Sequence, residues 1–295
     1  MENKSLEIRK AVKGDLERIK VIWKLCFEDE DYYIDFYFNN REWQEGMAVL
    51  LLDGSIVSML TMIPANITVE NGDTINSAML YAIATHPQYR NRGLADKLMR
   101  WSSNYLLLKQ IPATMLVPAE PALYKFYDRR GYKTECYIRE MTLSRELIEN
   151  INELNYSKCE LYSAEPERYN QIRRALLKGS TYVDYRESEI LFQKKTSQLF
   201  NADIYSIKIE GGEGCAIVER TEEMVIVKEL LIAEKFIVSA IKEISVQMPA
   251  QRYIIRTPSF YNCNIGGNVR PFGMVRVSKL PNPSPHNIYL GIAYD

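Results

Sequence analysis

Short apolar runs separated by turn residues dominate the first half of the chain, a pattern typical of strands joined by tight turns. The runs lie at residues 48–52, 55–62, 65–70 and 73–84. Asp53-Gly54 and Asn71-Gly72 fall between runs, and both dipeptides suit two-residue hairpin turns because such turns need positive φ. The pattern predicts a meander of strands. A strand and an amphipathic helix are predicted ahead of it, at residues 6–11 and 14–27.

A strand, a short loop and a helix are predicted at the end of this meander. Residues 79–84 are apolar, and apolar side chains then recur at the spacing of one helix face: Leu94, Leu98, Trp101, Tyr105 and Leu108. Gly93 and Ala95 lie where the helix begins, with Arg90 and Arg92 beside them. The free N–H groups and positive dipole end of a helix attract phosphate, and arginines add charge-assisted bonds. This corner therefore predicts a binding site for a phosphate-bearing ligand.

Two familiar phosphate loops do not fit this corner. The loop that binds nucleoside triphosphates needs Lys and then Ser or Thr after its second Gly, whereas Leu94 follows Gly93. The dinucleotide fingerprint needs three spaced glycines, and only one is present. A second glycine-rich stretch, residues 211–214, is flanked by strand-like sequence on both sides and is interpreted as a hairpin turn.

The pattern Arg90-x-x-Gly93-x-Ala95 resembles the acetyl-CoA loop of the GCN5-related N-acetyltransferase (GNAT) superfamily. A second motif follows a predicted strand at residues 113–117. There the helix after Pro121 ends in Phe126-Tyr127-Asp128-Arg129-Arg130-Gly131-Tyr132, which is similar to the Phe-Tyr-x-x-x-Gly-Phe/Tyr ending of that superfamily's next helix. The resemblance implies an α/β (α+β) fold in which helices flank a mixed sheet. It also implies an acetyl-CoA-dependent N-acetyltransferase with acetyl-CoA as cosubstrate.

The second half of the chain repeats the order of the first. Helices are predicted at residues 165–177, 185–200 and 234–246, and strands at 204–210, 215–219, 224–232, 252–256, 274–277 and 287–293. We interpret this half as a degenerate GNAT-like copy. At its strand-to-helix corner, Ala233-Glu234, no Gly or Arg is present and the carboxylate would repel phosphate. We therefore predict a cofactor-binding domain over residues 1–147 and a domain without a cofactor loop over 155–295. This plan resembles the enhanced-intracellular-survival acetyltransferases.

Composition narrows the classes of partner. The formal net charge is −1, and no run of 18 apolar residues occurs, so neither nucleic acid nor a membrane is an expected partner. The N-terminal residues are charged and lack the apolar core of a secretion signal. Five scattered cysteines suggest reduced thiols, and with only two histidines no multi-histidine metal centre is expected. The sequence predicts a cytoplasmic protein that uses no metal.

The resemblance implies a set of cofactor-binding residues. They are the end of the strand and the loop that follows: Ile83, Ala84, Thr85, Arg90, Asn91, Arg92, Gly93, Leu94 and Ala95. The arginines and loop amides would hold the diphosphate. The pantetheine arm would pair with the strand edge, where one amide would polarise the thioester carbonyl.

Tyr127 is the candidate general acid, through its place in the second motif. A thiol comparable to that of cysteine has a pKa of about 8.5 and tyrosine about 10. Protonation of the departing thiolate would therefore be uphill by about 1.5 pKa units, or about 2 kcal/mol.

A base is needed if the acceptor is an ordinary alkylamine, because removing its proton at neutral pH costs about 4–5 kcal/mol. Glu120 lies between the predicted strand and the Tyr127 helix; alternatively it is only a helix N-terminal carboxylate stabilised by the dipole. Asp295 is a second candidate, because a C-terminal carboxylate is the base in the enhanced-intracellular-survival group. Water, or binding of the rare neutral amine, stays open. Glu28 and its acidic neighbours through Asp31 form either a rim for a cationic acceptor or a solvated loop.

Two other functions stay open at this point. One is a CoA-binding sensor or interaction protein without catalysis, and the other is an aminoacyl-tRNA-dependent acyltransferase. The intact loop and Tyr127 argue against the first, and the net charge of −1 against the second. The expected partner is a small-molecule or peptide amine, and homo-oligomer formation stays open.

Overall fold

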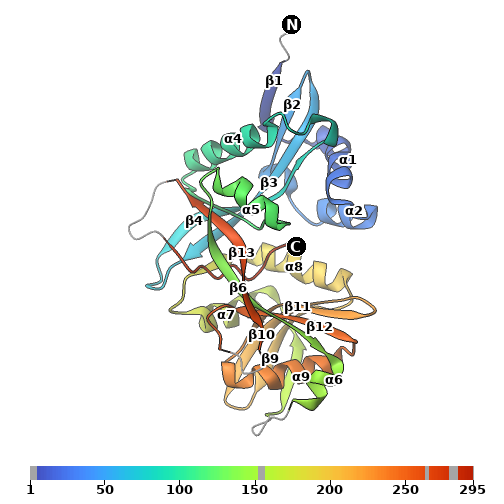
Figure 1. Cartoon of the computed structure of the whole chain (residues 1–295), viewed down its shortest axis with the longest axis vertical. Coiled ribbons are helices and arrows are strands. Elements are labelled where there is room, and N and C mark those ends of the chain that lie inside the picture. The colour runs from blue at the N-terminus through green and yellow to red at the C-terminus, as the bar shows by residue number, and fades with distance from the viewer. Residues whose placement is uncertain (1–4, 152–156, 263–265, 279–284, 295) are drawn as a thin grey trace. The chain divides into compact units, whose positions relative to one another are not determined.

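The computed structural model describes residues 5–151, 157–262, 266–278 and 285–294 and divides into two compact units. The first unit contains the chain up to Asn66, Ile75–Lys133 and the segment from Met274. The second contains Ile67–Thr74, Thr134–Gly273 and the segment from Pro285. Figure 1 gives the element labels used below. Within the described residues, no helix combines the length and apolar character needed to cross a membrane.

The sheet of the first unit has the order β1-β2-β3-β4-β5-β13. Its strands are β1 (Leu6–Lys10), β2 (Met47–Leu52), β3 (Ser55–Thr68), β4 (Thr74–Thr85), β5 (Ala113–Leu116) and the end of β13 (Asn268–Val277). Strand β2 pairs antiparallel with β1 and β3, whereas β4 and β5 pair in parallel. Asp53 and Gly54 both have positive φ, 48° and 78°, which confirms the predicted hairpin turn. The predicted mixed sheet is thus confirmed.

Helices flank this sheet. They are α1 (Leu16–Phe27), α2 (Asp31–Asn39), α3 (Trp43–Gly46), α4 (Leu94–Leu108) and α5 (Pro121–Asp128), with short 3-10 turns at Lys13–Asp15 and Pro87–Tyr89. Helix α4 buries Leu94, Leu98 and Leu106 in the cluster that also holds Leu80 of β4 and Tyr127 of α5. The predicted face is thus only partly correct: Leu94 and Leu98 are buried, whereas Leu108 is 85% exposed and Leu106 is buried in its place. Helix α2 was not predicted, because five of its nine residues are aromatic and follow no helical spacing of apolar and polar positions.

The sheet of the second unit has the order β7-β9-β10-β11-β12-β6. Its strands are β6 (Lys133–Ser144), β7 (Cys159–Ser163), β9 (Ile204–Ile209), β10 (Gly212–Arg220), β11 (Met224–Leu231) and β12 (Arg252–Pro258); β8 (Tyr182–Tyr185) is a further strand. The helices are α6 (Arg145–Asn150), α7 (Pro166–Leu177), α8 (Glu187–Leu199) and α9 (Ile237–Gln247), with a 3-10 turn at Glu234–Phe236. Gly212 pairs with Ile209 across the predicted hairpin, which confirms it.

Both units follow one plan, and each takes its last strand from the other half of the chain. In each, a helix connects two parallel neighbours: α4 between β4 and β5, and α9 between β11 and β12. Strand β6 pairs with β12, and Met274–Val277 of β13 pairs with β5. The functional division into residues 1–147 and 155–295 stays a prediction.

The predicted strand at residues 287–293 is wrong. In this segment only Ile288 and Tyr289 form isolated bridges, to Cys136 and Tyr182. The apolar run is nevertheless buried, with Leu290 at 0% exposure. Buried apolar sequence of this length packs equally well as irregular chain, provided that its backbone polar groups find partners. The Tyr185 hydroxyl supplies one, because it donates to the carbonyl of Ile292 at 2.6 Å.

A fully buried ion pair lies in the core of the second unit. Arg173 Nε is 2.9 Å from Glu229 Oε2, and both side chains are 0% exposed. The hydroxyl of Tyr169 also donates to Glu229, and Arg173 Nη1 donates to the carbonyl of Val183 at 2.7 Å. Gly291 packs so closely here that a Cβ would lie 2.0 Å from Glu229 Oε1. The pair therefore fixes α7, β11 and the C-terminal segment together.

Candidate active site

The corner predicted to bind phosphate has an unusual backbone. Gly93 is the N-cap residue of α4 with φ 68° and ψ 18°, and Asn91 has φ 63°. A Cβ placed on Gly93 would meet no heavy atom within 4 Å. Left-handed backbone, rather than crowding, therefore requires glycine here. The first N–H groups of α4 lack partners within the helix and border this open space, so a phosphate can approach them closely.

The two arginines of the loop lie on its outer side. Arg90 Nε donates to the carbonyl of Thr85 at 3.2 Å, and Arg92 Nη2 donates to the carbonyl of Gln88 at 3.3 Å. Arg92 also lies over the ring of Tyr89, 5.2 Å from its centroid. Both residues are exposed, and each guanidinium has further N–H groups. These side chains can therefore add donors to a phosphate at the helix start.

Strands β4 and β5 pair over only part of their length. The recorded pairs run from Ser77 opposite Ala113 to Met79 opposite Met115, while β4 continues to Thr85. Three residues after the last pair, Ala82 has φ 50°. Left-handed backbone costs a non-glycine residue about 1–2 kcal/mol, and such irregularities concentrate next to active sites. The end of β4, with Ile83, Ala84 and Thr85, thus extends beyond its partner at the point where the predicted cofactor loop begins.

Sequence reasoning missed Ala82, because alanine gives no signal for positive φ. It also missed Ser58 of β3, whose hydroxyl donates to the carbonyl of Ala84 at 2.6 Å and lies 2.9 Å from the hydroxyl of Thr85. Cys26 Sγ donates to the carbonyl of Thr85 at 3.3 Å. These bonds fix the end of β4 from the side of β3 and α1.

Tyr127 lies in the same buried cluster as Leu80 of β4 and Leu94 of α4 and is 8% exposed. Its hydroxyl makes no hydrogen bond to any residue that the structure describes, whereas the neighbouring Tyr132 hydroxyl lies 2.9 Å from that of Thr114. Burial raises the pKa of Tyr127 to about 12. The hydroxyl is therefore protonated at neutral pH and available to a ligand.

The raised pKa makes the energetics of proton transfer less favourable than the sequence predicted. Against a thiol pKa of about 8.5, a tyrosine pKa of about 12 leaves a deficit of about 3.5 units, or about 5 kcal/mol. A hydrogen bond from the intact hydroxyl to a sulfur anion has no such cost. The buried environment of Tyr127 therefore favours donation of a hydrogen bond to the sulfur over transfer of its proton. The catalytic role of Tyr127 stays a prediction.

The two candidate bases stay predictions. Glu120 is exposed and occupies the N-cap position of α5, where its side chain makes no capping bond. It lies seven residues, or about 10 Å of helix rise, before Tyr127. Asp295 lies outside the described residues. The structure therefore places Tyr127 in contact with the same cluster as Leu94, at the end of the predicted cofactor loop, whereas Glu120 is not part of that cluster.

The acidic segment is partly engaged. Asp29 accepts a hydrogen bond from the indole of Trp23 at 2.7 Å, and Asp31 pairs with Lys24 at 2.7 Å. His86 stabilises the short turn that it precedes, because its Nδ1 accepts from the N–H of Gln88 at 3.4 Å. Desolvation lowers its pKa, so the ring is neutral at pH 7. Within the described residues, no group of three or more His, Cys, Asp or Glu side chains has the arrangement to hold a metal ion.

The first unit of the chain is similar to one known protein family. Residues 7–134 match the family model described as an acetyltransferase (GNAT) domain. No curated protein matches the chain. The match includes β4, the Gly93 corner and α5 with Tyr127.

Solved structures share the fold over almost the whole chain. A GCN5-related N-acetyltransferase from Anabaena variabilis superposes with a TM-score of 0.74 at 15% identity, covering 93% of this chain and 73% of the other. One from Kribbella flavida gives 0.71 at 14% identity, covering 93% and 71%. Eis1 from Mycobacterium abscessus gives 0.67 at 12% identity, covering 92% and 74%. The similarity extends through both units, which supports the tandem plan.

Proposed function

Since residues 7–134 of this chain belong to the GNAT acetyltransferase domain family, we propose that the protein transfers an acetyl group from acetyl-CoA to a primary amine. The observation that carries the proposal is the corner at Gly93. Its left-handed backbone leaves open space above the start of α4, with Arg90 and Arg92 at hand.

The residues present fit acetyl-CoA. The N–H groups of Gly93, Leu94 and Ala95 and the two arginines bind its diphosphate. The part of β4 beyond Met79, which extends past the recorded pairing with β5, accepts the pantetheine arm as a neighbouring strand would. When bound, acetyl-CoA supplies the thioester whose carbonyl carbon the amine attacks directly in a ternary complex.

The protein contributes two further groups to this reaction. An amide near Ile83 at the end of β4 donates to the oxygen on which negative charge develops. Tyr127 donates a hydrogen bond toward the sulfur position, and because burial keeps its hydroxyl protonated it does so throughout the neutral range. Glu120, Asp295 or water takes the proton of the amine.

The test is thiol release from acetyl-CoA in the presence of a panel of primary amines, with calorimetry of CoA binding run in parallel. Turnover with at least one amine supports the proposal. Tight CoA binding without turnover across polyamines, aminoglycosides, amino acids and lysine peptides would instead indicate a sensor. Salt-sensitive tRNA binding without any CoA binding would indicate an aminoacyl-tRNA-dependent transferase.

A further inference from the structure

Ser58 of β3 places a buried hydroxyl against the end of β4. The side chain is 0% exposed, and both of its neighbours in the strand are apolar. Its Oγ donates to the carbonyl of Ala84 at 2.6 Å and lies 2.9 Å from Oγ1 of Thr85. A hydroxyl carries one proton and a carbonyl can only accept, so the Thr85 hydroxyl is the donor in the second bond. Two hydrogen bonds thus run from Thr85 through Ser58 to Ala84.

These bonds determine which way one amide of β4 faces. In a trans peptide group the C=O and the N–H point in opposite directions. The Ala84 carbonyl, which Ser58 holds, belongs to the same peptide group as the N–H of Thr85, so that N–H faces away from β3. The next peptide group is fixed in the same sense, because the N–H of His86 donates to the carbonyl of Val57 at 2.9 Å.

The edge of β4 that faces away from β3 is the edge on which β5 pairs. The recorded pairs with β5 end at Met79, so the Thr85 N–H lies on the part of this edge to which the proposed function assigns the pantetheine arm. The carbonyl of Thr85 faces the same way and accepts from Cys26 Sγ at 3.3 Å and from Arg90 Nε at 3.2 Å. The peptide groups on both sides of Thr85 are therefore restrained.

Resting on the proposed function, we propose that Ser58 is a positioning residue for acyl transfer: through the Ala84 carbonyl it orients the Thr85 N–H toward the thioester oxygen of bound acetyl-CoA. Donors to a developing negative charge act because they are oriented before the reaction, and loss of one lowers kcat by about 10²–10³. Removal of the Ser58 hydroxyl keeps the Thr85 donor but releases its direction. The expected loss is therefore smaller, about tenfold.

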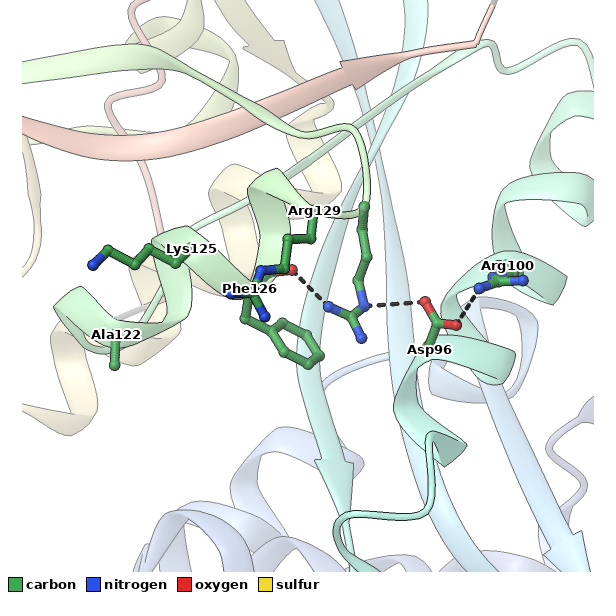
Figure 2. Close-up of a pocket in the computed structure, with 7 residues that line it drawn as sticks. Asp96, Arg100, Ala122, Lys125, Phe126 and Arg129 are labelled. Carbon is green, nitrogen blue, oxygen red and sulfur yellow. Dashed lines mark hydrogen bonds and ion pairs between the residues drawn. The ribbon is translucent and has the colours of Figure 1, made fainter.

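The start of α4 is held by separate contacts, so a change at Ser58 should leave CoA binding intact. Asp96, in the first turn of α4, pairs with Arg100 at 2.6 Å and with Arg130 at 3.0 Å. Figure 2 shows Asp96 joined by dashed lines to Arg100 on one side and to a guanidinium from the end of α5 on the other. Arg130 also lies over the ring of Phe126, 3.5 Å from its centroid. None of these contacts involves β3.

The test compares Ser58→Ala with Ser77→Ala. Each variant removes one buried hydroxyl from neighbouring strands of the same sheet, but the Ser77 hydroxyl makes no hydrogen bond to any residue that the structure describes. With an amine that the wild-type protein acetylates, Ser58→Ala should lower kcat about tenfold and change the KM of acetyl-CoA less than about twofold. Ser77→Ala should keep the wild-type values. Ser58→Cys, whose thiol is a weak donor, should have an intermediate kcat.

Infrared spectroscopy of bound acetyl-CoA provides a second measurement that does not depend on turnover. A hydrogen bond to the thioester oxygen polarises the carbonyl and lowers its stretching frequency, which isotopic labelling of the acetyl carbonyl identifies. The frequency should be lower in the wild-type protein and in Ser77→Ala than in Ser58→Ala. Calorimetric stoichiometry of CoA binding counts the folded molecules, so a loss of stability alone does not change this comparison.

Each alternative outcome is distinct. Wild-type kcat in Ser58→Ala, equal losses in the two alanine variants, or an unchanged carbonyl frequency would overturn the inference and leave the acetyltransferase proposal intact. If Ser58→Ala does not fold, wild-type kcat and frequency in Ser58→Cys would overturn it. Binding of acetyl-CoA without turnover of any amine would contradict the proposed function alone, since the infrared comparison still tests Ser58. Failure of the wild-type protein to bind acetyl-CoA would overturn both.

Discussion

The two units have the same corner in their sheets and use it differently. In the first, β4 leads to Gly93, whose φ of 68° opens the start of α4 to solvent. In the second, β11 leads to Ala233 with φ −55° and then to a 3-10 turn. The carboxylate of Glu234 accepts the N–H of Asn262 at 2.9 Å. At the Gly93 corner the first N–H groups of the helix are open to a ligand. At the Ala233 corner the carboxylate of Glu234 is already hydrogen-bonded to the backbone of Asn262.

The difference shows that two units with the same topology need not share the same binding site. The connection from strand to helix to parallel neighbour is preserved in both units, because packing of the helix on the sheet determines it. The site depends on local features: Gly93 has left-handed backbone, and the carboxylate in the first turn of α4, Asp96, is paired with Arg100 and Arg130. The buried polar groups of the second unit, above all Arg173 and Glu229, bond to one another.

The largest effect expected in the second unit is on stability. Arg173→Met leaves Glu229 buried without its cation and should lower the free energy of unfolding by about 3–5 kcal/mol. Urea denaturation measures it. The neighbouring Arg174→Met is the control, because its pair with Asp184 leaves the arginine side chain 45% exposed and should cost less than about 1 kcal/mol. Equal losses in the two variants would contradict a structural role for the buried pair.

In the first unit the largest effect should be on CoA binding. Gly93→Asp forces a Cβ into left-handed backbone and puts a carboxylate at the diphosphate site, which should weaken CoA binding by about a hundredfold, or about 2.7 kcal/mol. Calorimetry measures it. Gly54→Asp, at φ 78° in the β2–β3 turn, imposes similar strain and should leave the affinity unchanged. Wild-type affinity in Gly93→Asp would remove the basis of the comparison.

Tyr127→Phe should lower kcat by about thirtyfold, or about 2 kcal/mol, the value of a hydrogen bond to a charged group. Tyr132→Phe, which loses a bond to Thr114 instead, should cost stability and change kcat less than about twofold. Because burial raises the pKa of Tyr127 to about 12, the proton-donating form persists up to that pH. A Tyr127-dependent fall in rate near pH 10 would show that the hydroxyl is not buried as described.

The smallest effect concerns the second corner. Glu234→Gln should destabilise the second unit by about 1 kcal/mol, because the bond to the N–H of Asn262 loses its charge. Ala233→Gly/Glu234→Ala should still bind one CoA per chain, since removing the carboxylate alone does not recreate the left-handed corner. A second equivalent of CoA in calorimetry would mean that the two corners differ only in this carboxylate.

Much of the first unit follows directly from local sequence. Gly93 after an apolar strand and before an amphipathic run predicted the helix start, and the structure adds that this glycine has left-handed backbone. The dipeptide Asp53-Gly54 predicted a hairpin turn with positive φ, which the structure confirms. In each case the physical cause lies within a few residues of chain, where a sequence pattern can express it.

Only the tertiary structure decided the rest. The local sequence does not predict that β6 pairs with β12 and β13 with β5. Strand pairing depends on which segments lie side by side in the folded chain. Ala82 adopts positive φ against its own preference, so the surrounding sheet imposes it. Burial likewise raises the pKa of Tyr127 to about 12, and β3 brings the hydroxyl of Ser58 to the carbonyl of Ala84. By itself the sequence determined where the backbone turns and which side chains are available. Their protonation and neighbours came from the folded chain, because desolvation and charge proximity exist only once distant segments meet.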